Sequence, residues 1–431
     1  MRIFKTLIIA AFAFATAAGT LLAADDPLEI HGGGRVGFVV NGKLGSETGS
    51  YANNALGTMP NYGESSYFGF SFSKKFTSEG GAWAKVNYSF DNSSLADLDQ
   101  DCQPFTPRTR ATNVEFGGLD FLPAGTVLWG GLKGYGSGWN GMQDHSFINF
   151  SGVGIGLQNI GGVFSLAYMS YDQDDAQNLK LGERVTHNIV ANISVPVVEV
   201  WGAFGFSKKS DAKRADGKSE ENMTEFYVGG IYHAPVYGIN VGLSFQTNAY
   251  AAETYGNSYD TILKDHAWTT NSSAGYSKKE NACQGVRALV WTVTDLAPGF
   301  YVAPSFRYDM LMVGKDALAY GGKSIGKKNT WNRIDIAMKV SKALTKNIAF
   351  CPNFGFEREW DKEKAVNAKP HQLIQITPAF EMGLDTGFWA GQKLQLYGTF
   401  TKTDSDHKFA GGAYDGKTSG MTFGMLVTFG F

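Results

Sequence analysis

Hydrophobic and polar side chains alternate strictly at the C-terminal end of the chain. Large apolar residues take one set of alternate positions and small or polar residues mostly take the other: Met421, Phe423, Met425, Val427, Phe429 and Phe431 against Gly420, Thr422, Gly424, Leu426, Thr428 and Gly430. Successive side chains of a β-strand point to opposite faces of the sheet, so this pattern predicts a strand with one apolar face. The same alternation recurs at 82–90, 299–312, 331–342 and 373–384.

The predicted strands are long. Segments 299–312 and 331–342 exceed the average strand of about 5–6 residues. They reach the length of about 9–11 residues that a tilted strand needs to cross a bilayer. The positions opposite their apolar faces include Arg307, Asp309 and Arg333. Such residues would line a water-filled lumen, so the pattern favours a transmembrane β-barrel with a polar interior.

Polar, glycine-rich connections between the strands alternate between long and short. The long ones lie near 41–63, 92–107, 133–143, 172–183, 207–221, 249–283, 313–329, 358–370 and 404–418, and the short ones near 75–80, 119–124, 151–161, 195–197, 234–236, 295–298, 343–345 and 385–390. Long outer loops that take turns with short periplasmic turns are typical of outer-membrane barrels. The series joins 18 strands. The predicted fold is therefore all-β, an 18-stranded antiparallel transmembrane β-barrel wide enough for an aqueous channel.

Residues 1–24 have the three parts of a secretory signal peptide. Arg2 and Lys5 make a basic start, residues 6–22 are apolar, and small residues precede Asp25. A membrane anchor is the alternative, but the apolar run is short for a spanning helix, and no other stretch approaches about 18 apolar residues. We therefore expect residues 25–431 to form the barrel in the outer membrane of a bacterium.

Composition narrows the chemistry. Glycine contributes 54 of 431 residues and aromatic residues 14%, which suits many strands and turns, and the formal net charge of −2 gives no reason to expect a nucleic-acid partner. The histidines are scattered and no CxxC occurs, so neither a metal site nor another cofactor is expected. Cys102 and Cys283 both fall in outer loops, where a disulfide between them is conceivable, and Cys351 faces inward. No enzyme is predicted; a barrel enzyme or an adhesin-like surface protein is the alternative from another class.

Alternation also identifies side chains that face the lumen. Parity places Arg35, Tyr67, Trp83, Trp201 and Trp389 on the inner side. An aromatic ring can stack on the apolar C–H face of a sugar, while a charged side chain hydrogen-bonds its rim of hydroxyl groups. The alternative is that aromatic residues near strand ends belong to the interfacial girdle or fill space.

Five blocks of sequence resemble the maltoporin family of outer-membrane oligosaccharide channels. They are LEIHGGGRVGF at 28–38, RATNVEFGGLDFLPAGTVLWGG at 110–131, SGVGIGLQNIGGVFSLAYMS at 151–170, LYGTFTK at 396–402 and TFGMLVTFGF at 422–431. The resemblance implies an 18-stranded barrel that forms a homotrimer. It also implies a third loop folded into the pore and a row of aromatic residues, the greasy slide, beside an ionic track of charged residues.

Individual residues take their expected roles from this resemblance. Arg35, Arg110 and Asp144 match ionic-track positions, and Tyr67 and Trp389 match greasy-slide positions. By parity, however, Arg110 points outward, so it faces the lumen only if the strand end bends or bulges.

The third loop, about 133–146, is expected to narrow the pore. It carries Trp139 and Asp144, and the alternative is an ordinary exposed loop. Departures from the family pattern are Gly33 and Gly430 in place of aromatic residues and Ser146 in place of the constriction tyrosine. These departures leave the preferred sugar open.

Together these observations predict a channel for the passive diffusion of carbohydrates across the outer membrane. Maltose and maltodextrin-like oligosaccharides are the expected substrates, and a general or other-sugar porin is the alternative. The expected partners are the oligosaccharide, outer-membrane lipid and two further copies of the chain. The candidate substrate-binding residues are Arg35, Tyr67, Trp83, Arg110, Trp139, Asp144 and Trp389.

Overall fold

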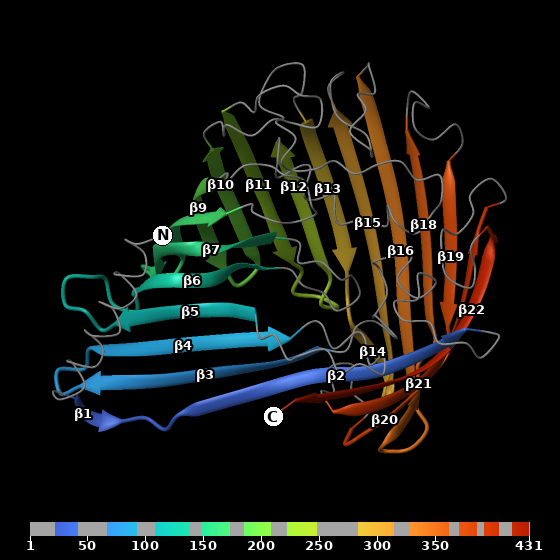
Figure 1. Cartoon of the computed structure of the whole chain (residues 1–431), viewed down its shortest axis with the longest axis horizontal. Helices are drawn as coiled ribbons and strands as arrows, with labels where there is room; N and C mark the ends of the chain where they lie inside the picture. The colour runs from blue at the N-terminus through green and yellow to red at the C-terminus, as the bar shows by residue number, and fades with distance from the viewer. Residues whose placement is uncertain are drawn as a thin grey trace.

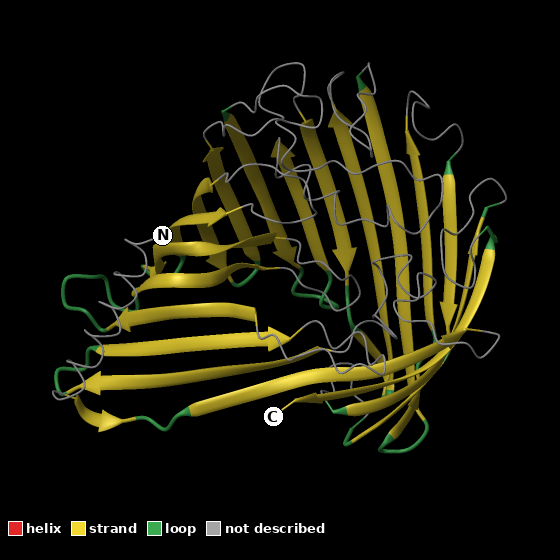
Figure 2. Cartoon of the chain, viewed as in Figure 1, coloured by secondary structure: helices red, strands yellow, loops and turns green. Residues whose placement is uncertain are grey.

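Antiparallel strands that each pair with their neighbours along the chain make up the described part of the protein (Figures 1 and 2). The computed structural model describes residues 22–41, 67–92, 108–137, 148–172, 185–207, 222–247, 283–313, 328–361, 370–385, 392–404 and 416–430. Among these residues, no helix is long and apolar enough to cross a membrane.

The strands are β1 (Leu22–Asp25), β2 (Glu29–Asn41), β3 (Tyr67–Ser78), β4 (Trp83–Asn92), β5 (Arg108–Gly117), β6 (Val127–Ser137), β7 (Ile148–Ile160), β8 (Phe164–Asp172), β9 (Val185–Val195), β10 (Val198–Ser207), β11 (Met223–His233), β12 (Asn240–Thr247), β13 (Cys283–Trp291), β14 (Thr294–Ala297), β15 (Phe300–Val313), β16 (Asn329–Ala343), β17 (Ile348–Phe350), β18 (Asn353–Asp361), β19 (His371–Thr377), β20 (Ala379–Gly383), β21 (Lys393–Thr403) and β22 (Ser419–Gly430).

The sheet closes on itself because β2 pairs with β22 from Gly33–Gly430 to Asn41–Thr422. The result is a closed antiparallel β-barrel of 18 strands, as the sequence predicts. The larger number of labelled segments arises because β13/β14, β17/β18 and β19/β20 are each one barrel strand with a short interruption, and because β1 lies outside the barrel series, beside the end of β3.

Prolines account for two of these three interruptions. Pro352 separates β17 from β18, and Pro378 separates β19 from β20. Proline has no N–H to donate to a sheet, so the ladder breaks there. The carbonyls of both prolines still accept bonds from neighbouring strands, from Val340 N at 3.0 Å and Gly398 N at 3.1 Å. Closure of the barrel is therefore preserved across the breaks.

The two faces of the barrel wall differ as the alternation predicts. On β11, Phe226 and Val228 point outward and are 57% and 53% exposed, whereas Glu225 and Tyr227, which alternate with them, point inward and are buried. On β12, Leu243 is 60% exposed and the next residue, Ser244, is buried. An exposed apolar outer surface around a polar inner one is the arrangement of a barrel in a lipid bilayer.

Three boundaries differ from expectation or stay untested. The segment 151–161 is not a turn but the larger part of β7, where Gly152, Gly154 and Gly156 face inward between apolar outward residues. β6 continues to Ser137, so the first part of the predicted third loop is strand, and residues 138–146 lie outside the described residues. The predicted signal peptide also lies outside them up to residue 21, and its predicted end falls within β1.

Candidate functional site

Strand register aligns a row of residues across β2, β3, β4 and β5. Arg35 on β2 is opposite Tyr67 on β3, and Gly33 is opposite Gly69, which in turn is opposite Asp91 on β4. Neither Gly33 nor Gly69 has a side chain, so at these two positions only the backbone of the barrel wall faces the lumen. We call Arg35, Tyr67, Gly69, Asp91 and Arg110 the β2–β5 row.

A β-bulge turns Arg110 into this row. Ser89 pairs with Ala111, but the next residue, Phe90, pairs with Thr109, so Arg110 is the extra residue on β5. A bulge of this kind re-aims the side chain of the extra residue. The Nε of Arg110 accordingly donates to the carboxylate of Asp91, which faces inward. Alternation along the sequence allowed Arg110 to face the lumen only if the strand end bends or bulges, and β5 has such a bulge.

Further ion pairs lie along the inner wall, between the β2–β5 row and the short-turn end of the barrel. Lys85 Nζ lies 2.9 Å from Glu29 Oε2. Lys133 Nζ lies 2.6 Å from Glu115 Oε1 and donates to Gln158 Oε1 at 2.9 Å. All of these groups remain partly exposed, so a solute in the lumen meets donors and acceptors side by side.

The predicted residue Trp83 lies at the other end of β4, away from the row. It is opposite Gly117, and its indole covers the position that a Gly117 side chain would occupy. The Nζ of Lys75 lies 5.4 Å from the ring centroid. Trp83 and Asp91 are eight residue steps apart along β4, which at about 3.3 Å a step places them roughly 26 Å apart. The structure thus places Trp83 at the short-turn end of the barrel and does not bring it together with Arg110.

The remaining candidates are only partly visible. The backbone of Tyr67 is described but its side chain is not, and Trp139, Asp144 and Trp389 lie outside the described residues. Their roles stay predictions.

An inward-facing aromatic cluster was missed at the level of the sequence, apart from Trp201. Its rings are in contact: Trp129 and Tyr135 have centroids 6.1 Å apart, Tyr135 and Trp201 5.2 Å, and Phe150 and Tyr227 5.3 Å. All five side chains are buried. The cluster therefore thickens and supports this side of the inner wall rather than presenting a free ring face.

Glycines on β7 make room for this cluster. A Cβ on Gly156 would lie 2.7 Å from Trp129 Nε1 and 2.8 Å from the carbonyl oxygen of Leu166. The sequence does contain an indication of this strand. Val153, Ile155 and Leu157 alternate with glycine, a pattern that indicates a strand with apolar side chains on one face and no side chains on the other.

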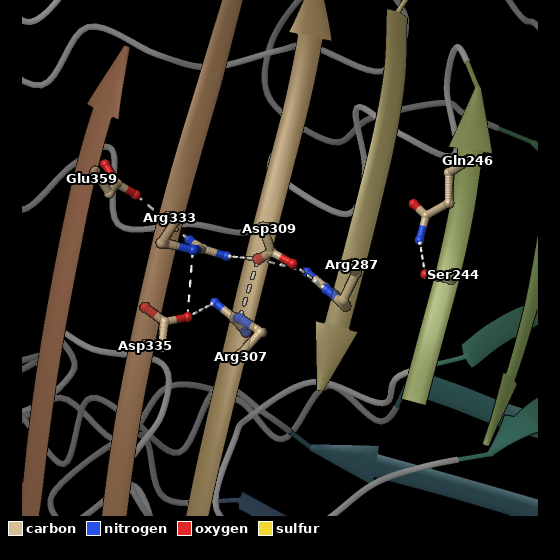
Figure 3. A network of polar contacts seen from close by, with 8 residues as sticks. All are labelled: Ser244, Gln246, Arg287, Arg307, Asp309, Arg333, Asp335 and Glu359. Atoms are coloured by element: carbon tan, nitrogen blue, oxygen red, sulfur yellow. Dashed lines mark hydrogen bonds and ion pairs between the residues drawn. The ribbon is translucent and has the colours of Figure 1, made fainter. Parts of the chain in front are cut away.

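The opposite side of the barrel carries a buried charge network on β13, β15, β16 and β18 (Figure 3). Asp309 is at its centre. Arg287 Nε lies 2.7 Å from Asp309 Oδ1, and Arg307 Nε and Arg333 Nη2 lie 3.1 and 2.8 Å from Asp309 Oδ2. Arg307 Nη2 also lies 2.5 Å from Asp335 Oδ2. The arrangement follows from register, since Asp309 is directly opposite both Arg287 and Arg333.

A second buried cluster lies nearer the short-turn end. Lys339 Nζ lies 2.8 Å from Glu381 Oε1, Lys393 Nζ lies 3.3 Å from Glu381 Oε2, and Gln395 Nε2 donates to Glu381 Oε1 at 2.8 Å. Both clusters join several neighbouring strands of the barrel and stiffen this half of the wall. Sequence alternation showed that Arg307, Asp309 and Arg333 face inward but not that they meet.

The described residues hold no group of three or more histidine, cysteine, aspartate or glutamate side chains arranged for a metal ion. Cys351 is buried as a free thiol with its Sγ 3.2 Å from Ser341 Oγ. Cys102 lies outside the described residues, and only the backbone of Cys283 is described. The conceivable bridge between those two cysteines stays a prediction.

Comparison with known proteins gives a family match over nearly the whole chain. The family model described as LamB porin matches residues 28–428. Similar solved structures include OmpF of Salmonella typhi in complex with daunomycin, at 11% identity and a TM-score of 0.48, with 95% of this chain and 100% of that chain covered. They also include OccD3 (OpdP) of Pseudomonas aeruginosa, at 9% identity and a TM-score of 0.44, with 96% and 92% covered. The outer-membrane channel DcaP of Acinetobacter baumannii matches at 9% identity and a TM-score of 0.42, with 94% and 97% covered.

Proposed function

Because the chain belongs to the LamB porin family, we propose that this outer-membrane porin admits carbohydrates, chiefly maltose and maltodextrin-like oligosaccharides, by passive diffusion. Solutes move down their own gradient, so the channel needs neither a cofactor nor a catalytic group. What the protein must supply is an inner wall that a sugar can contact without being held.

The observation that carries the proposal is the inward turn of Arg110 beside Asp91 in the β2–β5 row. Each sugar hydroxyl both donates and accepts a hydrogen bond. Arginine offers only donors and an ionised aspartate only acceptors, so the pair can engage two neighbouring hydroxyl groups at once. Arg35 supplies further hydrogen-bond donors on the other side of Gly33 and Gly69.

Charge pairing along the wall fits a neutral solute. Arg110 is paired with Asp91, Lys85 with Glu29 and Lys133 with Glu115. Interspersed charges of both signs offer many hydrogen bonds without creating a large field of one sign, which would favour ions. A wall of this kind suits polyhydroxylated molecules that carry no charge.

Aromatic residues would supply the apolar part of the contact. Tyr67 and Trp389 are proposed to stack on sugar rings, with Trp139 and Asp144 at the narrow part of the pore. Trp83 would contact the sugar at the short-turn end, where Lys75 adds a donor beside the ring. The complete channel is proposed to be a homotrimer.

A second candidate is a general or other-sugar porin with weak preference for maltodextrins. Gly33 and Gly430, which face each other across the closing pair of strands, favour it. Both stand where the maltoporin resemblance expects an aromatic ring, so a sugar would have fewer rings to follow.

Single-channel conductance in a planar bilayer tests both candidates. We expect an open channel that maltodextrins block stepwise at sub-millimolar to millimolar concentration. Block by sucrose but not by maltodextrins would favour the second candidate. A conductance that no oligosaccharide alters would refute sugar specificity altogether.

Trp389→Ala provides the matched variant. It should weaken block by maltodextrins while the amount of folded barrel stays the same. An unchanged block would remove Trp389 from the proposed contact surface.

A further inference from the structure

Two exposed basic side chains stand on the outer face of the barrel, at the ends of β18 and β21 that lead into 362–369 and 405–415. Arg358 shares outward parity with Phe356 on β18, and Lys402 shares it with Phe400 on β21. Arg358 is opposite Gln372 on β19, and Lys402 is opposite Ile374 on the same strand. With strands about 4.8 Å apart, the two Cα atoms lie within roughly 12 Å of each other.

Basic residues are unusual on this surface. An arginine or lysine on the lipid face costs about 2–4 kcal/mol at the middle of the bilayer but about 0–1 near its surfaces. Arg358 stands close to the end of β18 at Asp361, and Lys402 is next to the end of β21 at Thr403. Both positions therefore fall at the level of the lipid headgroups.

Among the residues whose side chains are described, the surroundings of Arg358 and Lys402 carry more positive than negative charge. Glu357 and Glu359 are buried on the inner face. Asp404, just after β21, is the acid close to them in the described part of the chain, and its carboxylate accepts a hydrogen bond from the backbone N–H of Gln372 at 2.8 Å. Lys417, exposed just before β22, adds a further positive charge.

Trp360 indicates the level at which Arg358 lies relative to the bilayer. The guanidinium carbon of Arg358 lies 5.9 Å from its ring centroid. Tryptophan favours the boundary between hydrocarbon and headgroups. A guanidinium beside such an anchor therefore lies at the level of the headgroups.

We propose that Arg358 and Lys402 form a binding site for the phosphate groups of an anionic lipid of the outer leaflet. The guanidinium fork matches two phosphate oxygens, and the ammonium group supplies a second positive charge on the other side of β19. The site lies on the outside of the barrel, so it is independent of what passes through the lumen.

Native mass spectrometry of the purified full-length barrel in detergent tests the site, with diphosphoryl lipid A as the probe. The wild type should retain bound lipid A, and the double variant R358Q/K402Q should bind it roughly 10–30-fold more weakly, since each basic residue near an anionic headgroup contributes about 1 kcal/mol. The affinity of R358K should fall between those of the wild type and the double variant, because lysine keeps the charge but loses the bidentate fork. The shift of the folded barrel on an unheated gel confirms that each variant is folded.

Lys342 provides the matched control. It is also exposed, outward-facing and beside an aromatic ring, with Nζ 5.8 Å from the centroid of Phe300, but it lies at the opposite end of the barrel. K342Q should bind lipid A as the wild type does. An equal loss in K342Q and R358Q/K402Q would overturn the proposal, because any outward cation would then suffice.

Two further outcomes decide the chemistry. Lipid A stripped of its phosphates should bind the wild type as weakly as intact lipid A binds the double variant. Equal binding of both lipids to the wild type would refute phosphate recognition. Displacement of lipid A by millimolar inorganic phosphate would show a site for free phosphate and not for a lipid. Sugar block of conductance should be unchanged in R358Q/K402Q, so this test and that of the channel function fail separately.

Discussion

Arg110 and Asp91 form an ion pair inside the barrel because one extra residue in β5 reverses the direction of the arginine. Without the bulge, Arg110 would point to lipid with Val114 and Phe116. The pair therefore connects a local backbone irregularity to the chemistry of the lumen.

R110Q should weaken the block of conductance by maltodextrins about 10-fold, since a hydrogen bond to a charged group contributes about 1.5–3 kcal/mol. The open-channel conductance should stay close to that of the wild type. The measurement is block against sugar concentration in single-channel recordings. R358Q, which removes an arginine from the outer face, is the control; if both variants lose block equally, the inner position of Arg110 is not the cause.

Asp309 should be the most sensitive position of the buried network. Its carboxylate forms ion pairs with Arg287, Arg307 and Arg333, so D309N leaves buried guanidinium groups with less compensation, at a cost of about 3–5 kcal/mol. Urea-induced unfolding of barrels refolded into lipid vesicles measures the loss. D295N, at an exposed aspartate of β14, should change the unfolding free energy by less than about 0.5 kcal/mol. A small loss in D309N would mean that the network contributes little to stability.

The lipid-facing surface predicts a dependence on depth. Leu243, in the middle of β12, is exposed on the outer face, so L243R should lower the unfolding free energy by about 2–4 kcal/mol. Leu384, exposed just after β20, tests the same substitution at the rim, where the cost should be about 0–1 kcal/mol. Equal costs at the two positions would contradict the assignment of β12 as a membrane-spanning strand.

Two adjacent glycines of β6 should respond differently to alanine. Gly131 has φ +125°, and a Cβ there would lie 2.3 Å from the carbonyl oxygen of Thr112. Alanine at 131 should therefore cost about 1–3 kcal/mol or more. The nearest atom to a Cβ on Gly130 is 3.9 Å away, so G130A should be tolerated. The unfolding free energies of G131A and G130A provide the comparison, and similar values would show that the backbone at 131 is not constrained.

Much of the architecture could be predicted from the sequence because one physical rule governs it. Strands alternate sides with a period of two, and a bilayer demands long strands with one apolar face. That rule placed Arg35, Trp83 and Trp201 inside, and the match to the LamB porin family confirms the expected family.

Features that depend on pairing between strands could not be predicted in the same way. The meeting of Arg287, Asp309 and Arg333 requires the register of three strands, which alternation within each strand does not contain. The bulge at Arg110 is likewise a property of β4 and β5 together. β7 was mistaken for a connection because its glycine content outweighed the alternation of Val153, Ile155 and Leu157.

The pairing of β2 with β22 also has a consequence for how the protein is made. These strands lie at opposite ends of the described chain, yet they share one ladder from Gly33–Gly430 to Asn41–Thr422. A ribosome delivers β2 first, and its free edge stays without that neighbour until β22 has been synthesised. Unpaired edges invite pairing with other chains. A holding chaperone that shields the growing chain, together with a template that guides insertion, would therefore matter most for this protein in the interval before the last strand arrives.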